Sequence, residues 1–239
     1  MYRLRKTSMA CEFPSLCSFA TAMVLASAFV LSAFSSAASV PQSRGVPYDK
    51  SFGPTFYQVI LDYSYPGTYE RMEAVNFRNL TLYVFDEGKK VQTQGKLGNG
   101  SYERKDNFGY ESLKLDSVHY LPSEDLNSQF ALVLYTWFSV GGSSSTDGVA
   151  QIYELKNHQL KLRQQFGWDE HFGTDKKYAV FSEESRTLTV RSAHYMPGDA
   201  HCCVSAADVV ALRWDGNGFT KRVVSVELSE FGVKSKKKL

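Results

Sequence analysis

The segment Ala131-Leu132-Val133-Leu134-Tyr135-Thr136-Trp137-Phe138 is apolar at almost every position. A short, continuous run of aliphatic, β-branched and aromatic side chains is typical of a β-strand whose two faces are both covered by other parts of the protein. We therefore expect residues 129–138 to form a central strand of a sheet.

The chain on either side of this segment also shows the periodicity of strands. In residues 159–166, Leu160, Leu162 and Phe166 alternate with polar side chains, as expected for a strand with one face exposed to solvent. Beyond residue 38, no segment has a convincing helical stripe of apolar residues. β-Branched and aromatic runs recur about every ten residues, and they predict strands at 55–63, 73–85, 110–119, 129–138, 148–155, 159–166, 177–181, 186–195, 207–214 and 218–228.

Turn sequences indicate that these strands run antiparallel. The segments 156–158 and 215–218 each separate two predicted strands, and 215–218 supplies residues that tolerate a positive φ in tight turns. Residues 141–148, rich in Gly and Ser, predict a flexible loop. The expected fold is therefore an all-β domain over 55–228, built as an antiparallel sandwich or a propeller-like stack of hairpins. A weak sub-boundary is expected near 99–109, where Gly, Asn and charged residues cluster.

The N-terminal region has the pattern of an export signal. Three basic residues near the start precede an uncharged apolar run at 18–34 and a group of small residues at 35–39. This order predicts a signal peptide over residues 1–38, cleaved after Ala38, followed by an extended leader at 39–54. We therefore expect a secreted or periplasmic protein with no transmembrane segment after signal cleavage.

Two other interpretations of the N-terminal region remain open. An uncleaved anchor needs about 20 apolar residues, and the run here is slightly short and ends in small residues. A lipoprotein requires a cysteine directly after the apolar run, whereas Cys11 and Cys17 precede it.

The charge balance argues against a nucleic-acid partner. Loss of the signal removes three of the 27 basic residues and one of the 25 acidic residues, which leaves equal numbers of each. Binding to phosphates requires a clustered basic surface, and the only basic excess lies in the Lys-rich tail at 229–239. We interpret that tail as a solvated C-terminus.

The adjacent cysteines Cys202 and Cys203 are the sharpest chemical feature of the chain. An exported protein meets an oxidising environment, so we expect this pair to form a disulfide. Neighbouring Cα atoms lie about 3.8 Å apart, below the usual disulfide range of about 4.4–6.8 Å, so the bond would close a strained ring. The default role is to rigidify a loop; the alternatives are a redox switch, a contact patch for a ligand and an intermolecular bond.

A soft-metal site is the alternative interpretation of the same region. His194, His201, Cys202 and Cys203 offer four donors of the type that Cu(I) or Zn prefers. Adjacent cysteines point to opposite sides of an extended chain, and oxidation removes the thiolates. We therefore expect no cofactor, with Cu or Zn as the alternative.

The region around these cysteines resembles a known family. The matching residues are Gly198-Asp199-Ala200-His201-Cys202-Cys203, Ser205, Leu212-Arg213-Trp214-Asp215-Gly216 and Phe219. They are similar to segments of uncharacterised exported bacterial proteins, the LppP/LprE-type lipoproteins and their non-lipidated relatives. Those proteins commonly have proline after the second cysteine, where this chain has Val204. The resemblance implies export and an unassigned role, and it implies no reaction.

Enzyme signatures are absent from the sequence, which contains no G-x-S-x-G elbow, no H-E-x-x-H motif and no Walker loop.

Residues 167–173 predict an aromatic loop in which Trp168, Asp169 and His171 contact a carbohydrate or peptide, unless the loop folds back onto the core. The expected function is that of an exported, non-catalytic binding or envelope-associated protein whose partner is a protein or a cell-envelope component. A hydrolase of envelope polymers, acting through carboxylates such as Asp169 or Glu170, is a second alternative.

Overall fold

The structure is a computed structural model that describes residues 55–107, 109–141, 143–170, 178–200 and 204–228, all within one compact unit, residues 38–239. The signal peptide, the leader and the C-terminal tail lie outside the described residues. The strands are β1 (Phe56–Ser64), β2 (Thr81–Phe85), β3 (Val91–Lys96), β4 (Ser101–Asp106), β5 (Gly109–Leu121), β6 (Ser128–Gly141), β7 (Ser143–Lys156), β8 (Gln159–Asp169), β9 (Ala179–Ser182), β10 (Thr187–His194), β11 (Ala206–Trp214) and β12 (Phe219–Leu228). Two short 3-10 helices, η2 (Met72–Ala74) and η3 (Phe77–Asn79), precede β2.

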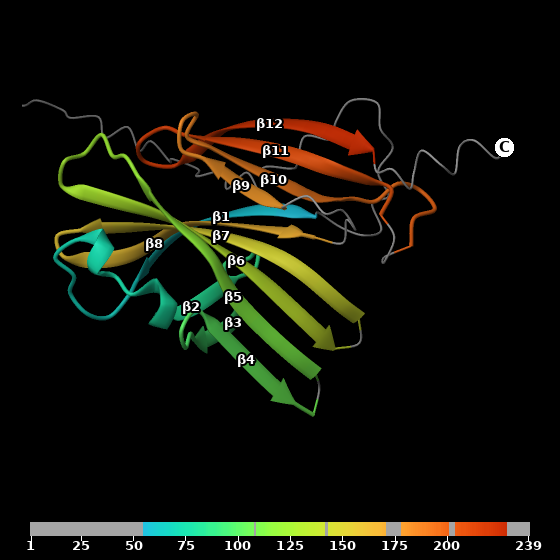
Figure 1. Cartoon of the computed structure of the whole chain (residues 1–239), viewed down its shortest axis with the longest axis horizontal. Coiled ribbons are helices and arrows are strands. Elements are labelled where there is room, and N and C mark those ends of the chain that lie inside the picture. The colour runs from blue at the N-terminus through green and yellow to red at the C-terminus, as the bar shows by residue number, and fades with distance from the viewer. Residues whose placement is uncertain (1–54, 108, 142, 171–177, 201–203, 229–239) are drawn as a thin grey trace, which may run out of the picture. The chain divides into compact units, whose positions relative to one another are not determined.

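The described strands form three antiparallel sheets, which confirms the prediction of an all-β fold. A six-stranded sheet has the order β1-β8-β7-β6-β5-β4, a four-stranded sheet has the order β12-β11-β10-β9, and β2 pairs with β3. The four-stranded sheet packs against one face of the six-stranded sheet, and the β2–β3 hairpin packs against the other (Figure 1). The six-stranded sheet is therefore the middle layer of a sandwich.

The central strand β6 is covered on both faces, as its sequence predicts. Val133 and Tyr135 belong to the apolar cluster beneath the β2–β3 hairpin, whereas Leu132 and Leu134 belong to the cluster beneath the four-stranded sheet. Side chains of a strand alternate between its faces, so an unbroken apolar run supplies both cores at once.

Strand β8 does not keep one face toward solvent, contrary to the alternation in its sequence. The register against β7 slips between Ile152 and Tyr153, so Arg163 has no opposing residue on β7. The bulge reverses the alternation. Leu162 consequently packs under the β2–β3 hairpin, whereas Phe166 packs under the four-stranded sheet.

Three other segments differ from the sequence prediction. The predicted strand 73–85 is a strand only from Thr81, because η2 and η3 occupy its first half. Strands β3 and β4 were not predicted because their sequences are mostly polar; β4 lies within the expected sub-boundary region and pairs with β5. The prediction of a loop at 141–148 is wrong, because β6 runs to Gly141 and β7 begins at Ser143. Backbone pairing between the two strands continues to this point although the sequence is rich in Gly and Ser.

The predicted hairpin turns are confirmed. Asn157 and His158 have φ values of 50° and 63° between the paired residues Lys156 and Gln159, as a tight two-residue turn requires. Gly216 has a φ of 103° in the turn that joins β11 to β12.

The described part of the chain has no helix that is long and apolar enough to span a membrane.

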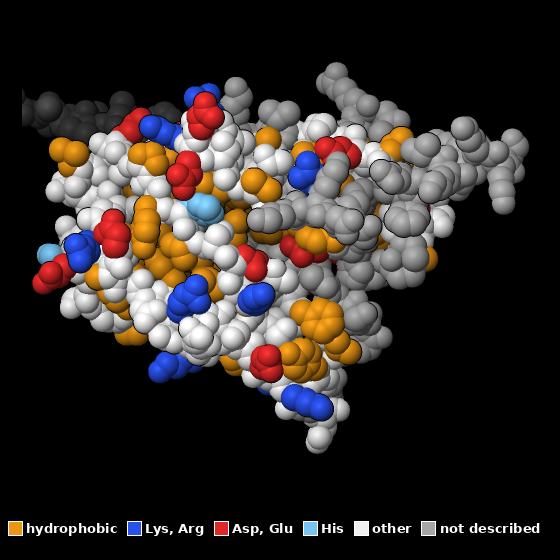
Figure 2. Space-filling model, viewed as in Figure 1, with side chains coloured by type: hydrophobic (Ala, Val, Ile, Leu, Met, Phe, Trp, Pro, Cys, Tyr) orange, Lys and Arg blue, Asp and Glu red, His pale blue; other side chains and the backbone are white. Residues whose placement is uncertain are grey.

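The surface mixes charges of both signs. Figure 2 shows acidic and basic side chains interspersed over one face, with hydrophobic side chains in small groups between them. On this face the described residues form no continuous basic surface.

Candidate functional site

Two glycines, Gly148 within β7 and Gly167 near the end of β8, hold aromatic rings close to the backbone of the middle sheet. Gly148 pairs with Trp168 across β7 and β8, and Gly167 pairs with Tyr57 across β8 and β1. A Cβ atom at Gly148 would overlap the indole of Trp168, and one at Gly167 would overlap the ring of Tyr57. Glycine within a strand often marks such a close approach, so the two glycines fix where these rings lie.

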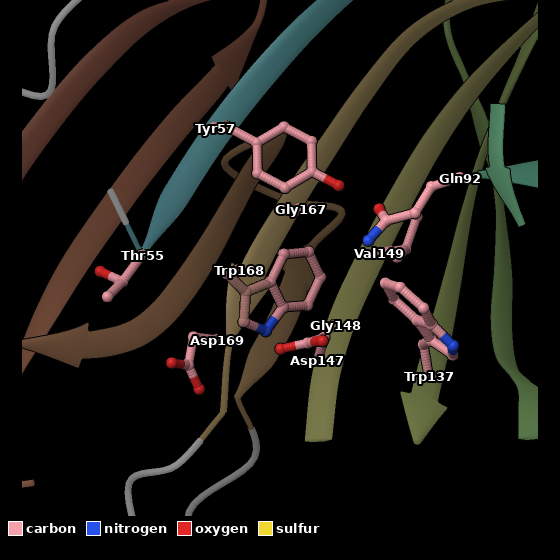
Figure 3. A pocket seen from close by; sticks show the side chains of 10 residues that line it. All are labelled: Thr55, Tyr57, Gln92, Trp137, Asp147, Gly148, Val149, Gly167, Trp168 and Asp169. Carbon is pink, nitrogen blue, oxygen red and sulfur yellow. The ribbon is translucent and has the colours of Figure 1, made fainter. Parts of the chain in front are cut away.

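A pocket of about 220 Å³ opens beside these rings. Its walls come from five strands and from the residue preceding β1, which no local stretch of sequence could bring together (Figure 3). We call it the aromatic pocket, and it is lined by Thr55, Tyr57, Gln92, Trp137, Asp147, Gly148, Val149, Gly167, Trp168 and Asp169.

The indole of Trp137 is fixed by a buried carboxylate. Its Nε1 donates a hydrogen bond to Glu111 Oε1 at 2.9 Å, and the Thr93 hydroxyl donates to the same oxygen at 2.5 Å. Arg104 Nη2 lies 3.2 Å from Oε2 of the same carboxylate. Glu111 itself is only 5% exposed. Strands β3, β4, β5 and β6 thus all contribute to the position of one pocket side chain.

The ring of Tyr57 is fixed through Phe85 and Gln165. The Tyr57 hydroxyl donates to the carbonyl oxygen of Phe85 at 3.2 Å, and Gln165 Nε2 donates to the Tyr57 hydroxyl at 3.4 Å. Gln165 also bonds both backbone groups of Phe85, which joins β8 to the end of β2. Burial raises the pKa of Tyr57 far above its ordinary value, and the negative charge of Asp147 raises it further. The phenol therefore stays neutral.

Trp168 is fixed by Glu170. Its Nε1 donates to Glu170 Oε1 at 3.0 Å, and Glu170 is 8% exposed. Burial raises the pKa of Glu170 to about 7 and the charges of Asp116, Asp147 and Asp169 act in the same direction, whereas the bond from Trp168 opposes the rise. A carboxyl group that titrates near neutrality therefore lies directly behind a pocket residue.

Asp169 links the pocket to the four-stranded sheet. Its Oδ2 accepts a hydrogen bond from the Tyr195 hydroxyl at 2.9 Å, and its backbone N–H donates to Thr55 O at 2.9 Å. Tyr195 directly follows β10 and is buried. The rim of the pocket is thus tied to both packed sheets.

The structure brings together only part of the site expected from the sequence. Trp168 and Asp169 both line the aromatic pocket, but they lie on β8 rather than in a loop, and Trp168 is only 3% exposed. His171 lies outside the described residues. Sequence reasoning missed Tyr57, Gln92, Trp137 and Asp147. The signal that could have found them is a pair of glycines, Gly148 at the start of the predicted strand 148–155 and Gly167 directly after the predicted strand 159–166.

The cysteine region is described only in part, since His201, Cys202 and Cys203 lie outside the described residues. His194 is 1% exposed, and its Nδ1 lies 3.0 Å from Asp208 Oδ1. Among the residues that the structure describes, no group of three or more His, Cys, Asp or Glu is arranged to hold a metal ion. The disulfide and the soft-metal site therefore stay predictions.

Ser192, His194 and Asp208 supply the residue types of a catalytic triad, but their arrangement is different. The Ser192 hydroxyl donates to the carbonyl oxygen of Thr55, and Ser192 is fully buried. A nucleophile must reach its base and its substrate. This trio is therefore better explained as a buried polar contact that joins β10 and β11 to the residue preceding β1.

A larger hollow of about 460 Å³ lies beside η2, η3 and β5, and its lining includes Glu73, Arg78, Asp116 and Tyr120, all exposed. It lacks the buried anchors of the aromatic pocket.

Comparison with models of known protein families, with curated proteins and with solved structures found no match. The function is therefore argued from the aromatic pocket itself.

Proposed function

We propose that this chain is an exported, non-catalytic binding protein that engages a peptide or cell-envelope component through the aromatic pocket. The observation that supports this most directly is the anchoring of Trp137, Tyr57 and Trp168. Each ring has its polar atom bonded to a buried or partly buried partner. Rings that are fixed before a ligand arrives lose little conformational entropy on binding.

The size and lining of the pocket suit one small group of a larger ligand. Pockets for drug-sized molecules have volumes of about 300–1,000 Å³, and this one has about 220 Å³. It combines three aromatic side chains with the Gln92 amide, the Thr55 hydroxyl and the carboxylates of Asp147 and Asp169. A few polar groups on an aromatic background are the usual means of orienting a bound group.

Binding is favoured over hydrolysis because the two candidate catalytic carboxyls are both engaged in structural contacts. Asp169 accepts a bond from Tyr195, and Glu170 accepts one from Trp168. A glycosidase needs one carboxyl directed at the leaving group and a second at the sugar or a water molecule. The described contacts use these groups to position the walls of the pocket instead.

Blocking the pocket from its exposed side tests the proposal. Gln92 and Gln94 are both exposed on β3, but only Gln92 lines the pocket. We expect Gln92→Trp to abolish binding of probes that bind the native protein, whereas Gln94→Trp leaves binding unchanged. The probes are monosaccharides and amino-acid amides, measured by saturation-transfer NMR, with equal melting temperatures confirming that both variants are folded. If Gln92→Trp binds every probe as the native protein does, the aromatic pocket is not the ligand site.

The export and disulfide predictions are tested by the mass of the protein recovered after secretion. We expect a chain that begins at Ser39, has a mass about 2 Da below its fully reduced value because two hydrogens are lost, and resists alkylation until it is reduced. Two alkylatable thiols, or a retained copper or zinc ion in the native mass, would instead support the soft-metal alternative at Cys202 and Cys203.

A further inference from the structure

Tyrosine rings gather where β1 meets the β2–β3 hairpin. Tyr63, near the end of β1, and Tyr83 in β2 have ring centroids 4.6 Å apart, with the ring planes tilted by 47°. Tyr65, directly after β1, lies 5.3 Å from Tyr63 and 5.8 Å from Tyr83. Among the contacts between tyrosine rings that the structure describes, the Tyr63–Tyr83 contact is the shortest, and it joins two different sheets.

These two rings are within reach of solvent, whereas the tyrosines behind them are not. Tyr63 and Tyr83 are both half-buried, and the Tyr83 hydroxyl accepts a hydrogen bond from the exposed Gln94 at 3.4 Å. Tyr65 is only 3% exposed, and Tyr153, the next ring of the group, is fully buried. An oxidant in solution therefore reaches Tyr63 and Tyr83 before any other ring of this group.

The two phenols also act on each other. Burial raises the pKa of Tyr63, and the neighbouring phenol of Tyr83 raises it further. Tyr63 is therefore protonated at neutral pH, so its oxidation removes a proton together with the electron and leaves a neutral phenoxyl radical. Two such radicals held in contact react as if in a single molecule, which favours their coupling over encounters in solution.

We propose that Tyr63 and Tyr83 form a dityrosine cross-link when the protein meets a one-electron oxidant, such as a peroxidase that uses hydrogen peroxide. Each phenol loses one hydrogen atom to the oxidant, and one peroxide molecule is reduced to two molecules of water. A carbon–carbon bond then forms between ring positions ortho to the two oxygens. Each bonded carbon releases its proton and each oxygen regains one, which restores both phenols. This modification site is separate from the aromatic pocket and goes beyond the proposed binding function.

The cross-link would join two layers of the fold by a covalent bond. Tyr63 and Tyr83 both pack at the margin of the apolar cluster between the β2–β3 hairpin and the middle sheet. A bond between them closes the intervening chain into a loop and so restricts the unfolded state, as a disulfide does. The cross-linked protein is therefore expected to unfold at a higher urea concentration than the untreated protein.

Peroxidase and hydrogen peroxide, applied to the secreted protein, test this proposal. Trypsin cleaves after Lys and Arg, so it leaves Tyr63 in the peptide 51–71 and Tyr83, with no other tyrosine, in the peptide 79–89. We expect mass spectrometry to find these two peptides joined, with dityrosine fluorescence, and fragment ions to place the bond at Tyr63. The yield should not depend on protein concentration, because both rings belong to one molecule.

Substitutions of Tyr by Phe assign the bond, because each removes a hydroxyl and keeps the ring. Tyr63→Phe and Tyr83→Phe are each expected to abolish the joined peptide. Tyr65→Phe is the matched control from the same group of rings, and it should preserve the joined peptide. Equal melting temperatures will confirm that the variants are folded, and the concentration series on the native protein tests the same point without a substitution.

Three results would overturn the inference. The first is a joined peptide that is recovered only from covalent dimers, with a yield that rises with protein concentration. The second is a joined peptide that survives in Tyr63→Phe or is lost in Tyr65→Phe. The third is that the two peptides stay separate while N-acetyl-tyrosinamide, added to the same solution, is converted to its dityrosine.

Discussion

Gly148→Ala is expected to lower the free energy of unfolding by about 3 kcal/mol or more, the range measured for losing a large aromatic side chain from a core. The new Cβ would overlap the indole of Trp168. That indole cannot easily move, because it belongs to the core beneath the four-stranded sheet and is bonded to Glu170. Either the indole leaves its place or β7 and β8 separate locally, and urea unfolding will measure the loss.

The matched control for this substitution is Gly98→Ala. A Cβ atom at Gly98 would meet no atom within 4 Å, so the free energy of unfolding is expected to change by less than about 0.5 kcal/mol. A double-mutant cycle gives the mechanism: once Trp168 is already alanine, Gly148→Ala should cost little more. If Gly148→Ala is as stable as the native protein, the ring does not lie over the glycine and the geometry of the aromatic pocket is wrong.

The sequence predicts the fold where both periodicity and burial are strong. The apolar run of β6 and the turns at 156–158 and 215–218 are local signals, and each is confirmed. Strand β3 gives no such signal, because only Thr93 and Gly95 among its residues are buried. A strand that covers one edge of a core needs few apolar residues, so its sequence looks like a loop.

The bulge at Arg163 shows a second limit of sequence reasoning. It sends Leu162 and Phe166 to opposite faces of β8, although their even spacing places them on one face of a regular strand. The extra residue depends on the register against β7, which is a tertiary property. Nothing in the local sequence therefore predicts which face Trp168 occupies.

Only the part of the aromatic pocket formed by the end of β8 could be found from the sequence. Trp168 and Asp169 follow Gly167 in the sequence, and their mixed aromatic and acidic character is visible locally. Tyr57 and Trp137 reach the pocket because β1 and β7 both pair with β8, and β6 pairs with β7. Only the pairing order of the six-stranded sheet brings these side chains to one pocket.

Glu170→Gln is expected to stabilise the protein above neutral pH by about 3 kcal/mol. The pKa of Glu170 is about 7 in the folded chain, against an ordinary value of 4.5, and each unit of difference corresponds to about 1.4 kcal/mol. Between these two values the unfolded chain releases a proton that the folded chain retains, so the free energy of unfolding falls as pH rises through this window. Glutamine keeps an oxygen that accepts the Trp168 bond and has no proton to lose.

The measurement is urea unfolding of the native protein and of Glu170→Gln at pH about 4 and about 8, on either side of this window. The two proteins should have similar stability at the lower pH and differ at the higher pH. Glu154→Gln is the matched control: Glu154 is also 8% exposed on the middle sheet, but it accepts a bond from Ser128 and lies 3.4 Å from Arg163. Its replacement breaks an ion pair, so it should not stabilise the protein at either pH. An equal difference in stability between Glu170→Gln and the native protein at both pH values would show that the effect is one of packing rather than charge.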